Sequence, residues 1–388
     1  MPTALTPDQL HHDLAIRDLT DPQAGPHAIQ LLVEAAVDTL KEAWNCEVRR
    51  ERGPRVVPLD DNYDRLGYPP AAITRDSRYT RYVDERRVLR SHTTAMIPSA
   101  LAELAGKPAD DVLLVCPGIS YRRDVIDRLH TGTPHQLDLW RITRRRMDDA
   151  HLEEMLRLLV DVLVPGREWR WEPRVHPYTS NGRQVDVRDG DAWVEVWECG
   201  LAHPDVLANA GLDGWSGLAL GMGLDRLLML RKGIADIRLL RSTDARVAVQ
   251  MRDLSPYRPV STLPALSRDL SVAIPVDADA EELGDRIRGA LGDRADILEA
   301  VTILSETRHA DLPPAARGRL GISETQKNVL VRLDLRPLDR TLTDAEANGL
   351  RDDVYKAIHE GSNGQWAVRT GGGPPTPASP RYRQVRRC

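Results

Sequence analysis

The 388-residue sequence contains no phenylalanine, so its aromatic side chains come from eight tryptophans, nine tyrosines and the histidines. Lysine is also scarce, because 48 of the 53 basic residues are arginine. This imbalance is typical of a GC-rich genome, in which codons for Phe and Lys are rare. Codon usage lowers the expected number of phenylalanines but does not predict zero, so the absence calls for a further explanation.

Other absences exclude several classes of protein. The four cysteines show no C-x-x-C spacing, which argues against a disulfide framework and a zinc site. No apolar run approaches the roughly 18 residues of a membrane-spanning helix, and the first residues lack a basic-then-apolar export signal. A net charge of −5 argues against nonspecific nucleic-acid binding by a polycation. We therefore expect a cytoplasmic protein without a membrane partner.

The first 252 residues show the pattern of a mixed or antiparallel sheet with flanking helices. Apolar residues recur at helical spacing over 28–44, and a second long helix is predicted over 147–163. Short β-like runs lie at 111–116, 135–142 and 192–198, separated by long excursions that do not fit regular βαβ winding. Strict alternation in the third run predicts that Trp193, Glu195 and Trp197 share one face.

A second domain follows a proline-rich junction. Its predicted order is β-α-β-β-α-β, the ferredoxin-like arrangement, and Thr343 with Glu346 forms a capping box before the second helix. The class is therefore α+β. We predict a first domain over 1–252 with an N-terminal helical extension over 1–50, a linker over 253–266, a ferredoxin-like domain over 267–370 and a disordered tail over 371–388. The predicted strands and helices of the second domain are 269–275, 280–291, 297–305, 328–336, 344–359 and 365–369.

A charged segment over 117–139 is the first candidate site. Arg122 and Arg123 stand beside Asp124 between two predicted strands, and Gln136 and Asp138 lie on the returning strand. Two arginines beside an acid can hold a polyphosphate while the acid selects an amine. The alternative is a solvated loop of paired charges, to which Asp127 and His130 would also belong.

A second candidate is the segment 217–230, GLALGMGLDRLLML. Gly221 and Gly223 allow close approach of the backbone, and a helix then begins with Asp225 and Arg226 in its first turn. An arginine is unfavourable at the positive end of a helix dipole, so Arg226 should have a compensating partner. The alternative is a glycine-containing helix that only packs on the sheet, because the spacing is not that of a dinucleotide-binding loop.

Together these segments resemble motifs 2 and 3 of the class II aminoacyl-tRNA synthetases, and are most similar to the phenylalanyl-tRNA synthetase catalytic subunit. The resemblance extends over residues 60–370, and the C-terminal part is similar to the family's anticodon-binding domain. Both modules on one chain look like the single-chain form of the enzyme. The segments that carry the likeness are 91–94, 121–138, 193–200, 221–227, 233–246, 267–269 and 340–344.

The resemblance implies an ATP-dependent ligase that forms an aminoacyl adenylate. Arg122 would offset the charge on the α-phosphate, Arg226 would bind the γ-phosphate and stack on adenine, and Glu195 would be a Mg²⁺ ligand. Asp124, His130 and Gly223 would complete the ATP site. The residues implied for the amino-acid site are His92, Thr94, Asp124, Gln136, Asp138, His176, Tyr178, Ala219 and Gly221.

Departures from the family concentrate on recognition of the substrate side chain. Where the family has a Phe-Pro-Phe loop against the substrate ring, this sequence has His176-Pro177-Tyr178. Pro134 replaces the aromatic residue that stacks on adenine, and Asp138 is shorter than the family's glutamate. Buried polar groups reject substrates that lack the matching group. We therefore expect an amino acid more polar than phenylalanine, either a hydroxylated aromatic or a different amino acid.

Three functions remain open for such a chain. The first is amino-acid activation followed by transfer to tRNA, in a homodimer whose interface includes the 28–44 helix. The second is a ligase of specialised metabolism that passes the activated amino acid to another acceptor. The third is a catalytically silent paralogue that binds amino acid or tRNA. The missing phenylalanines then have two explanations: drift with a changed substrate, or a protein made correctly where Phe codons are poorly charged.

Overall fold

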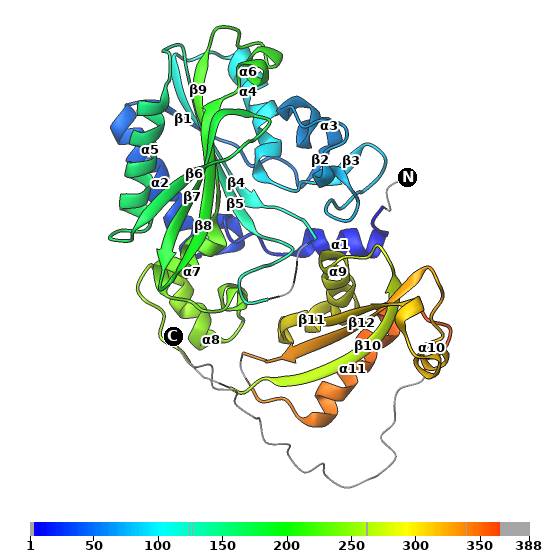
Figure 1. The fold of residues 1–388 in the computed structure, drawn as a ribbon. Helices are drawn as coiled ribbons and strands as arrows, with labels where there is room; N and C mark the ends of the chain where they lie inside the picture. Colours follow the sequence, from blue (N-terminus) through cyan, green and yellow to red (C-terminus); the bar gives the residue numbers. More distant parts are fainter. Residues whose placement is uncertain (1–3, 124, 126, 261–262, 339, 365–388) are drawn as a thin grey trace, which may run out of the picture.

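The computed structural model describes residues 4–123, 125, 127–260, 263–338 and 340–364. Its centre is a seven-stranded sheet, and a smaller three-stranded sheet lies in the C-terminal part (Figure 1). The large sheet has the order β1-β4-β5-β9-β8-β7-β6, and β1 with β4 is its parallel pair. This confirms the predicted α+β class. The strands are β1 (Glu47–Arg50), β4 (Asp111–Ile119), β5 (His135–Thr143), β6 (Trp169–Pro173), β7 (Thr179–Asp189), β8 (Ala192–Ala202) and β9 (Ser216–Gly223).

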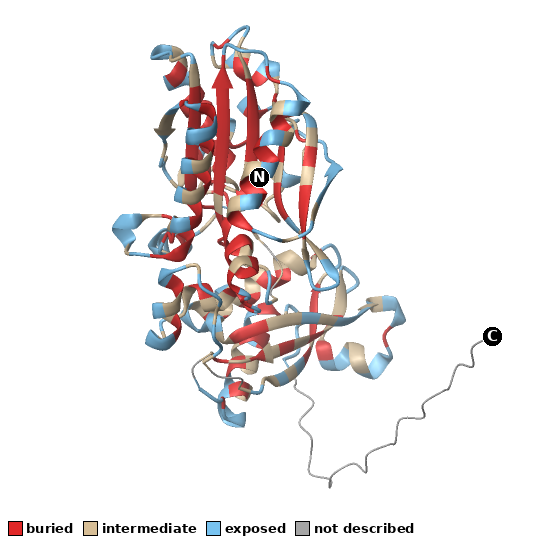
Figure 2. Cartoon of the chain, turned by 90° about the vertical axis from the view of Figure 1, so that its left-hand side faces the viewer, coloured by how far each residue is buried: buried red, intermediate tan, exposed pale blue. Residues whose placement is uncertain are grey.

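Three helices share one core with the large sheet: α2 (Ala28–Trp44), α5 (Asp149–Leu163) and α7 (Leu224–Lys232). The predicted helix over 28–44 is confirmed at both ends, and the apolar residues spaced along it are buried. The side chain of Asp148 caps α5 by accepting from the backbone N–H groups of Ala150 and His151. The strands between the helix layers are the most continuously buried part of the chain (Figure 2).

The opposite face of the sheet is only partly covered. Side chains of α4 (Ile97–Gly106) and α6 (Pro204–Asn209) pack there against β4, β5 and β9. The hairpin-like pair of β2 (Val56–Pro58) and β3 (Arg87–Leu89) flanks α3 (Leu59–Asn62), while α1 (Pro7–Ala15) and α8 (Ala245–Ala248) lie nearer the C-terminal part (Figure 1). None of the helices in the described ranges is long and apolar enough to cross a membrane.

A bulge in β8 overturns the alternation predicted for 192–198. Asp186 pairs with Glu195, but the next pair joins Val185 to Trp197, which leaves Val196 as an extra residue. Trp197 therefore enters the core with Val194, and Glu195 does not share its face. The prediction was wrong because period-two alternation holds only while the pairing register is regular.

The C-terminal part contains a three-stranded antiparallel sheet with the order β10-β12-β11. Its helices α9 and α11 pack on the same core, and the predicted capping box at Thr343 and Glu346 is present. Helix α10 lies where the sequence predicted a polar loop. The predicted strand 365–369 and tail 371–388 lie outside the described residues, so the complete ferredoxin-like arrangement and the domain boundaries stay predictions. The elements are β10 (Leu266–Pro275), α9 (Ala280–Leu291), β11 (Leu298–Arg308), α10 (Pro314–Leu320), β12 (Gln326–Leu335) and α11 (Asp344–Ile358).

Ionic contacts join the two parts of the chain, and the cation of one of them, Arg81, is buried. Nη1 of Arg81 donates to both carboxylate oxygens of Asp13, at 2.7 and 2.8 Å, and its Nη2 donates to Asp285 of α9 at 2.7 Å. Arg128 likewise contacts Glu299 of β11. Helix α9 thus lies against the segment that follows β4 (Figure 1).

We expect Arg81→Ala to lower the free energy of unfolding by about 3 kcal/mol, because it leaves buried carboxylates without their cation. Arg87→Ala is the matched control: Arg87 is 58% exposed and pairs with the exposed Asp84, so its loss should cost less than about 1 kcal/mol. Denaturant titrations followed by tryptophan fluorescence measure both values. Equal losses of unfolding free energy in the two variants would contradict the assignment of Arg81 as a buried ionic contact.

Candidate active site

A cavity of about 150 Å³ opens where β5 begins, β9 ends and α7 begins. Two glycines of β9 face β5 at this cavity. Gly223 pairs with Gln136, and Gly221 pairs with Asp138. The cavity brings together segments that are distant in sequence. The predicted site residues that line it are Arg122, His130, Gln136, Glu195, Gly221, Gly223 and Arg226.

Arg122 reaches the cavity from the segment between β4 and β5. Its backbone N–H donates to the carbonyl of Gly132 at 3.0 Å, which closes this segment on itself, and its side chain is exposed. A cation in this position can contact an anionic ligand in the cavity. Asp124, which was predicted to contact both ATP and the amino acid, lies outside the described residues.

Arg226 has the compensating partner that its position in the first turn of α7 requires. Nη1 donates to the backbone carbonyl of Glu195 at 3.0 Å, and Nη2 lies 3.4 Å from Nε2 of His130. His130 is held in turn by the carboxylate of Asp127, at 2.8 and 2.9 Å from Nδ1. The arginine is therefore oriented along the cavity wall.

Two carboxylates of β8, Glu195 and Glu198, line the same cavity. Burial raises the pKa of Glu195, and the neighbouring charge of Glu198 raises it further. A cation would relieve this repulsion, and Mg²⁺ commonly uses one or two protein carboxylates together with phosphate oxygens. Within the described residues no group of three or more His, Cys, Asp or Glu side chains could hold a metal. Glu195 could supply one carboxylate to an ion whose other ligands are phosphate oxygens and water.

The predicted amino-acid end of the site lies deeper. Thr93 donates from its hydroxyl to Asp138 at 2.6 Å and from its backbone N–H to Gln136 at 3.2 Å. Burial raises the pKa of Asp138 to about 6, although hydrogen bonds from Thr93, Thr94 and Trp140 oppose the rise. Thr94 is buried between Asp138 and the hydroxyl of Tyr178.

Aromatic rings fill the space around these polar groups. Tyr178 stacks on Trp140, with ring centroids 6.0 Å apart, and on His176 at 5.6 Å. Tyr68 continues the series at 6.3 Å from Tyr178. The side chain of Ala219 is fully buried against this cluster. His176, Tyr178 and Ala219 are thus brought together as predicted, but they lie behind the cavity wall.

His92 is neutral, because burial lowers its pKa to about 4. Its ring lies 5.8 Å from that of Tyr68, and neither ring nitrogen has a hydrogen-bond partner among the residues that the structure describes. Unpaired buried nitrogens are unfavourable, so they point to a ligand that would pair with them.

Sequence reasoning missed Glu198 and Thr93. Alternation along 192–198 placed residue 198 on the face opposite Glu195, and only the bulge at Val196 brings both carboxylates to the same cavity. Thr93 directly precedes the predicted Thr94, but the 3₁₀ turn over Thr93–Met96 aims the first hydroxyl at Asp138.

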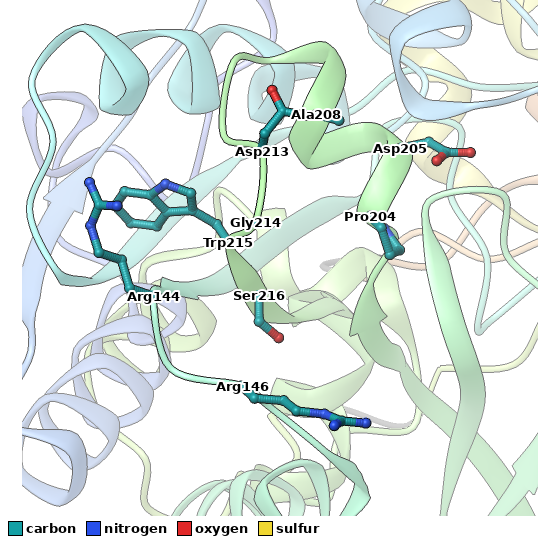
Figure 3. A pocket seen from close by; sticks show the side chains of 9 residues that line it. All are labelled: Arg144, Arg146, Pro204, Asp205, Ala208, Asp213, Gly214, Trp215 and Ser216. Carbon is teal, nitrogen blue, oxygen red and sulfur yellow. The ribbon is translucent and has the colours of Figure 1, made fainter.

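A larger hollow at the opposite end of the sheet contains none of the predicted site residues (Figure 3). Arg144 lies over the ring of Trp215, 4.5 Å from its centroid, and forms one wall. Arg146, Asp205 and Asp213 also line this hollow. Its exposed and mixed charges do not add chemistry to the first site.

The raised pKa of Asp138 predicts a pH-dependent stability. Because the folded chain holds this proton more tightly than the unfolded chain, stability falls as pH rises between about 4 and 6. A rise of the pKa from 3.8 to about 6 corresponds to about 3 kcal/mol. We expect the Asp138→Asn variant to lack this pH dependence. The free energy of unfolding of the variant minus that of the parent chain should therefore rise by about that amount between pH 4 and pH 7. Denaturant titrations at several pH values measure this difference. An equal change of unfolding free energy with pH in both proteins would contradict the prediction.

Residues 12–251 match the family described as tRNA synthetases class II core domain (F). A probable mitochondrial phenylalanine–tRNA ligase of Drosophila melanogaster is 26% identical over 369 residues, which cover 80% of this chain and 77% of the relative. A phenylalanine–tRNA ligase alpha subunit of Prochlorococcus marinus is 32% identical over 240 residues, covering 60% and 69%. A pyrrolysyl-tRNA synthetase from Desulfitobacterium hafniense aligns with a TM-score of 0.44 at 19% identity, over 56% of this chain and 74% of that one. The family match and the two sequence relatives show that the chain belongs to the class II tRNA synthetase core family, of the phenylalanine type.

Proposed function

We propose that this ligase uses ATP and Mg²⁺ to form an aminoacyl adenylate and then transfers the aminoacyl group to tRNA. The observation that carries the proposal is the single cavity that joins Arg122, Arg226 and Glu195. These residues come from three separate segments, and each lies at a position where the family resemblance assigns it a role. A protein that only binds an amino acid has no need for this phosphate-binding set.

The proposed reaction is an in-line displacement at phosphorus. A carboxylate oxygen of the amino acid attacks the α-phosphorus of ATP, the bond to the bridging oxygen breaks, and pyrophosphate leaves with that electron pair. The Arg122 guanidinium offsets the negative charge that develops on the α-phosphate, and a preorganised donor of this kind accelerates the step by about 10²–10³. Arg226 binds the γ-phosphate. Glu195 would hold Mg²⁺, which supplies charge neutralisation when bound.

The proposed substrate is an amino acid other than phenylalanine. His176 lies 3.1 Å from the carboxylate of Glu198, and Tyr178 presents a buried hydroxyl beside Thr94. These polar groups stand where the resembled family has two phenyl rings. The site therefore lacks the two phenyl rings that would pack on the ring of a phenylalanine substrate.

Transfer to tRNA is supported by the family, although the C-terminal part is acidic. Residues 254–369 contain 15 Lys and Arg against 19 Asp and Glu, a difference of −4. Phosphate contacts dominate nucleic-acid affinity, so binding would depend on basic residues clustered on one surface. A small-molecule acceptor in specialised metabolism remains the alternative, and this acidic balance is the observation that favours it.

We also propose a cytoplasmic homodimer. The apolar face of α2 is buried against α5 and α7 within the same chain. A dimer would therefore use the exposed side of α2 or the outer edge of β1, which ends the large sheet.

Activation is tested by ATP–pyrophosphate exchange. We expect Arg122→Ala and Arg226→Ala each to reduce kcat/KM at least about 100-fold, because both remove a cation from the phosphate site. Arg157→Ala is the control, since Arg157 on α5 is 69% exposed and pairs with Glu153 of the same helix. Absence of exchange in the parent chain with every amino acid would favour the silent paralogue.

Transfer is tested with labelled amino acid and total tRNA from the host. We expect an acid-precipitable, base-labile aminoacyl-tRNA that appears only with ATP and the activated amino acid, because an aminoacyl ester hydrolyses in base. Exchange without any labelled tRNA would instead favour the ligase of specialised metabolism.

A further inference from the structure

A notch lies between two carboxylates on the face of the large sheet that α4 and α6 partly cover. Asp138 of β5 pairs with Gly221 of β9, and Gly221 pairs with Glu198 of β8. Directly paired residues project from the same face, so the two acids flank the glycine at a Cα separation of about 10 Å, twice the strand spacing. Gly221 has no side chain to fill the space between them.

The notch is closely bounded and opens toward the phosphate site. A Cβ atom on Gly221 would lie 3.7 Å from both carboxylate oxygens of Asp138, so any side chain there would occupy the space. Gln136, Gly221 and Glu198 line the same cavity as Arg122 and Arg226.

Aromatic side chains fill the volume beyond the notch. The next paired row consists of Trp140, Ala219 and Gly200, and all three are buried. Trp140 is fully buried and stacks on Tyr178 at 6.0 Å between ring centroids. Of the described residues, neither Trp140 nor Tyr178 lines the cavity. A bulky substrate ring would have to displace this stack, whereas a short side chain would not.

The carboxylate of Glu198 is held by two basic side chains of the segment between β6 and β7. His176 Nε2 lies 3.1 Å and Arg174 Nε 3.4 Å from its oxygens. A carboxylate accepts about four hydrogen bonds, so Glu198 retains capacity for a ligand.

We propose that the notch selects a short α-amino acid whose side chain ends in a hydrogen-bond donor, an amine or a hydroxyl. Its α-amino group binds Asp138 and Gln136, and its side-chain donor binds Glu198. This inference rests on the proposed amino-acid activation and names the substrate class of that site. Glu198 then determines specificity, while the Trp140–Tyr178 stack limits length.

The test is ATP–pyrophosphate exchange with matched amino-acid pairs that differ in the donor. Serine is compared with 2-aminobutyrate, and 2,4-diaminobutyrate with norvaline, beside phenylalanine and tyrosine. For the best pair we expect kcat/KM of the donor-bearing member to exceed that of its analogue by at least about 100-fold, because a site built for a donor rejects ligands lacking it. Equal rates within both pairs would overturn the inference.

The variants Glu198→Gln and Glu198→Ala test whether Glu198 binds the side-chain donor of the substrate. We expect the preference within the best pair to fall below about 10-fold in the alanine variant, with a smaller loss in the glutamine variant, which still accepts one hydrogen bond. Glu172→Gln is the matched control, because Glu172 of β6 is 55% exposed and pairs with Arg170. An unchanged preference in Glu198→Ala would overturn the assignment. Should these variants fail to fold, the pairwise comparison in the parent chain decides alone.

The outcomes separate this inference from the proposed function. Exchange that is fastest with phenylalanine or tyrosine would overturn the inference and leave amino-acid activation standing. Exchange with no amino acid in the panel or among the remaining proteinogenic amino acids would overturn the proposed function itself, and the inference with it.

Discussion

The geometry of the site depends on the buried pair of His135 and Asp225. Asp225 accepts from the backbone N–H of His135 and lies 3.0 Å from its Nδ1, while Nε2 of the same ring accepts from the backbone N–H of Leu19 at 3.0 Å. Burial raises the pKa of Asp225, but the hydrogen bonds from His135 and the charge of Arg241 hold it below its usual range. This pair joins the N-terminal segment, the start of β5 and the first turn of α7. Arg226 and Gln136 are the chain neighbours of the pair, so it fixes their relative positions.

Elements with a strong local pattern could be predicted from the sequence. The helix over 28–44 and the helix over 280–291 are observed with the predicted bounds, because a wide apolar stripe leaves one stable way to bury each helix. Strands β6 and β7 were not predicted. Charged residues such as Arg170, Arg183 and Arg188 interrupt their apolar pattern, and these arginines are accommodated by stacking on Trp171 and Trp193, which local sequence does not reveal.

The candidate site could be predicted in part, mainly through the family resemblance. The residues that bind phosphate in that resemblance converge on one cavity, because their chain positions at strand and helix ends are fixed by the fold. Glu198 could not be found in this way. Its position depends on the bulge at Val196 and on a register that runs across three strands, and both are properties of long-range pairing. The cluster of aromatic rings around Tyr178 likewise depends on long-range packing, because it joins residues as far apart in sequence as Tyr63 and Tyr178.

The segment that carries Arg122 is held at two points by the C-terminal part of the chain. Arg128 contacts Glu299 of β11, and Arg288 of α9 donates to the carbonyl of Val125. Ordering a segment of this length costs conformational entropy, and these contacts offset part of that cost before any ligand arrives. Thermodynamic linkage then applies in both directions. A nucleotide that binds more tightly to the ordered segment strengthens the docking of α9 and β11 by the same free energy that their docking adds to nucleotide binding.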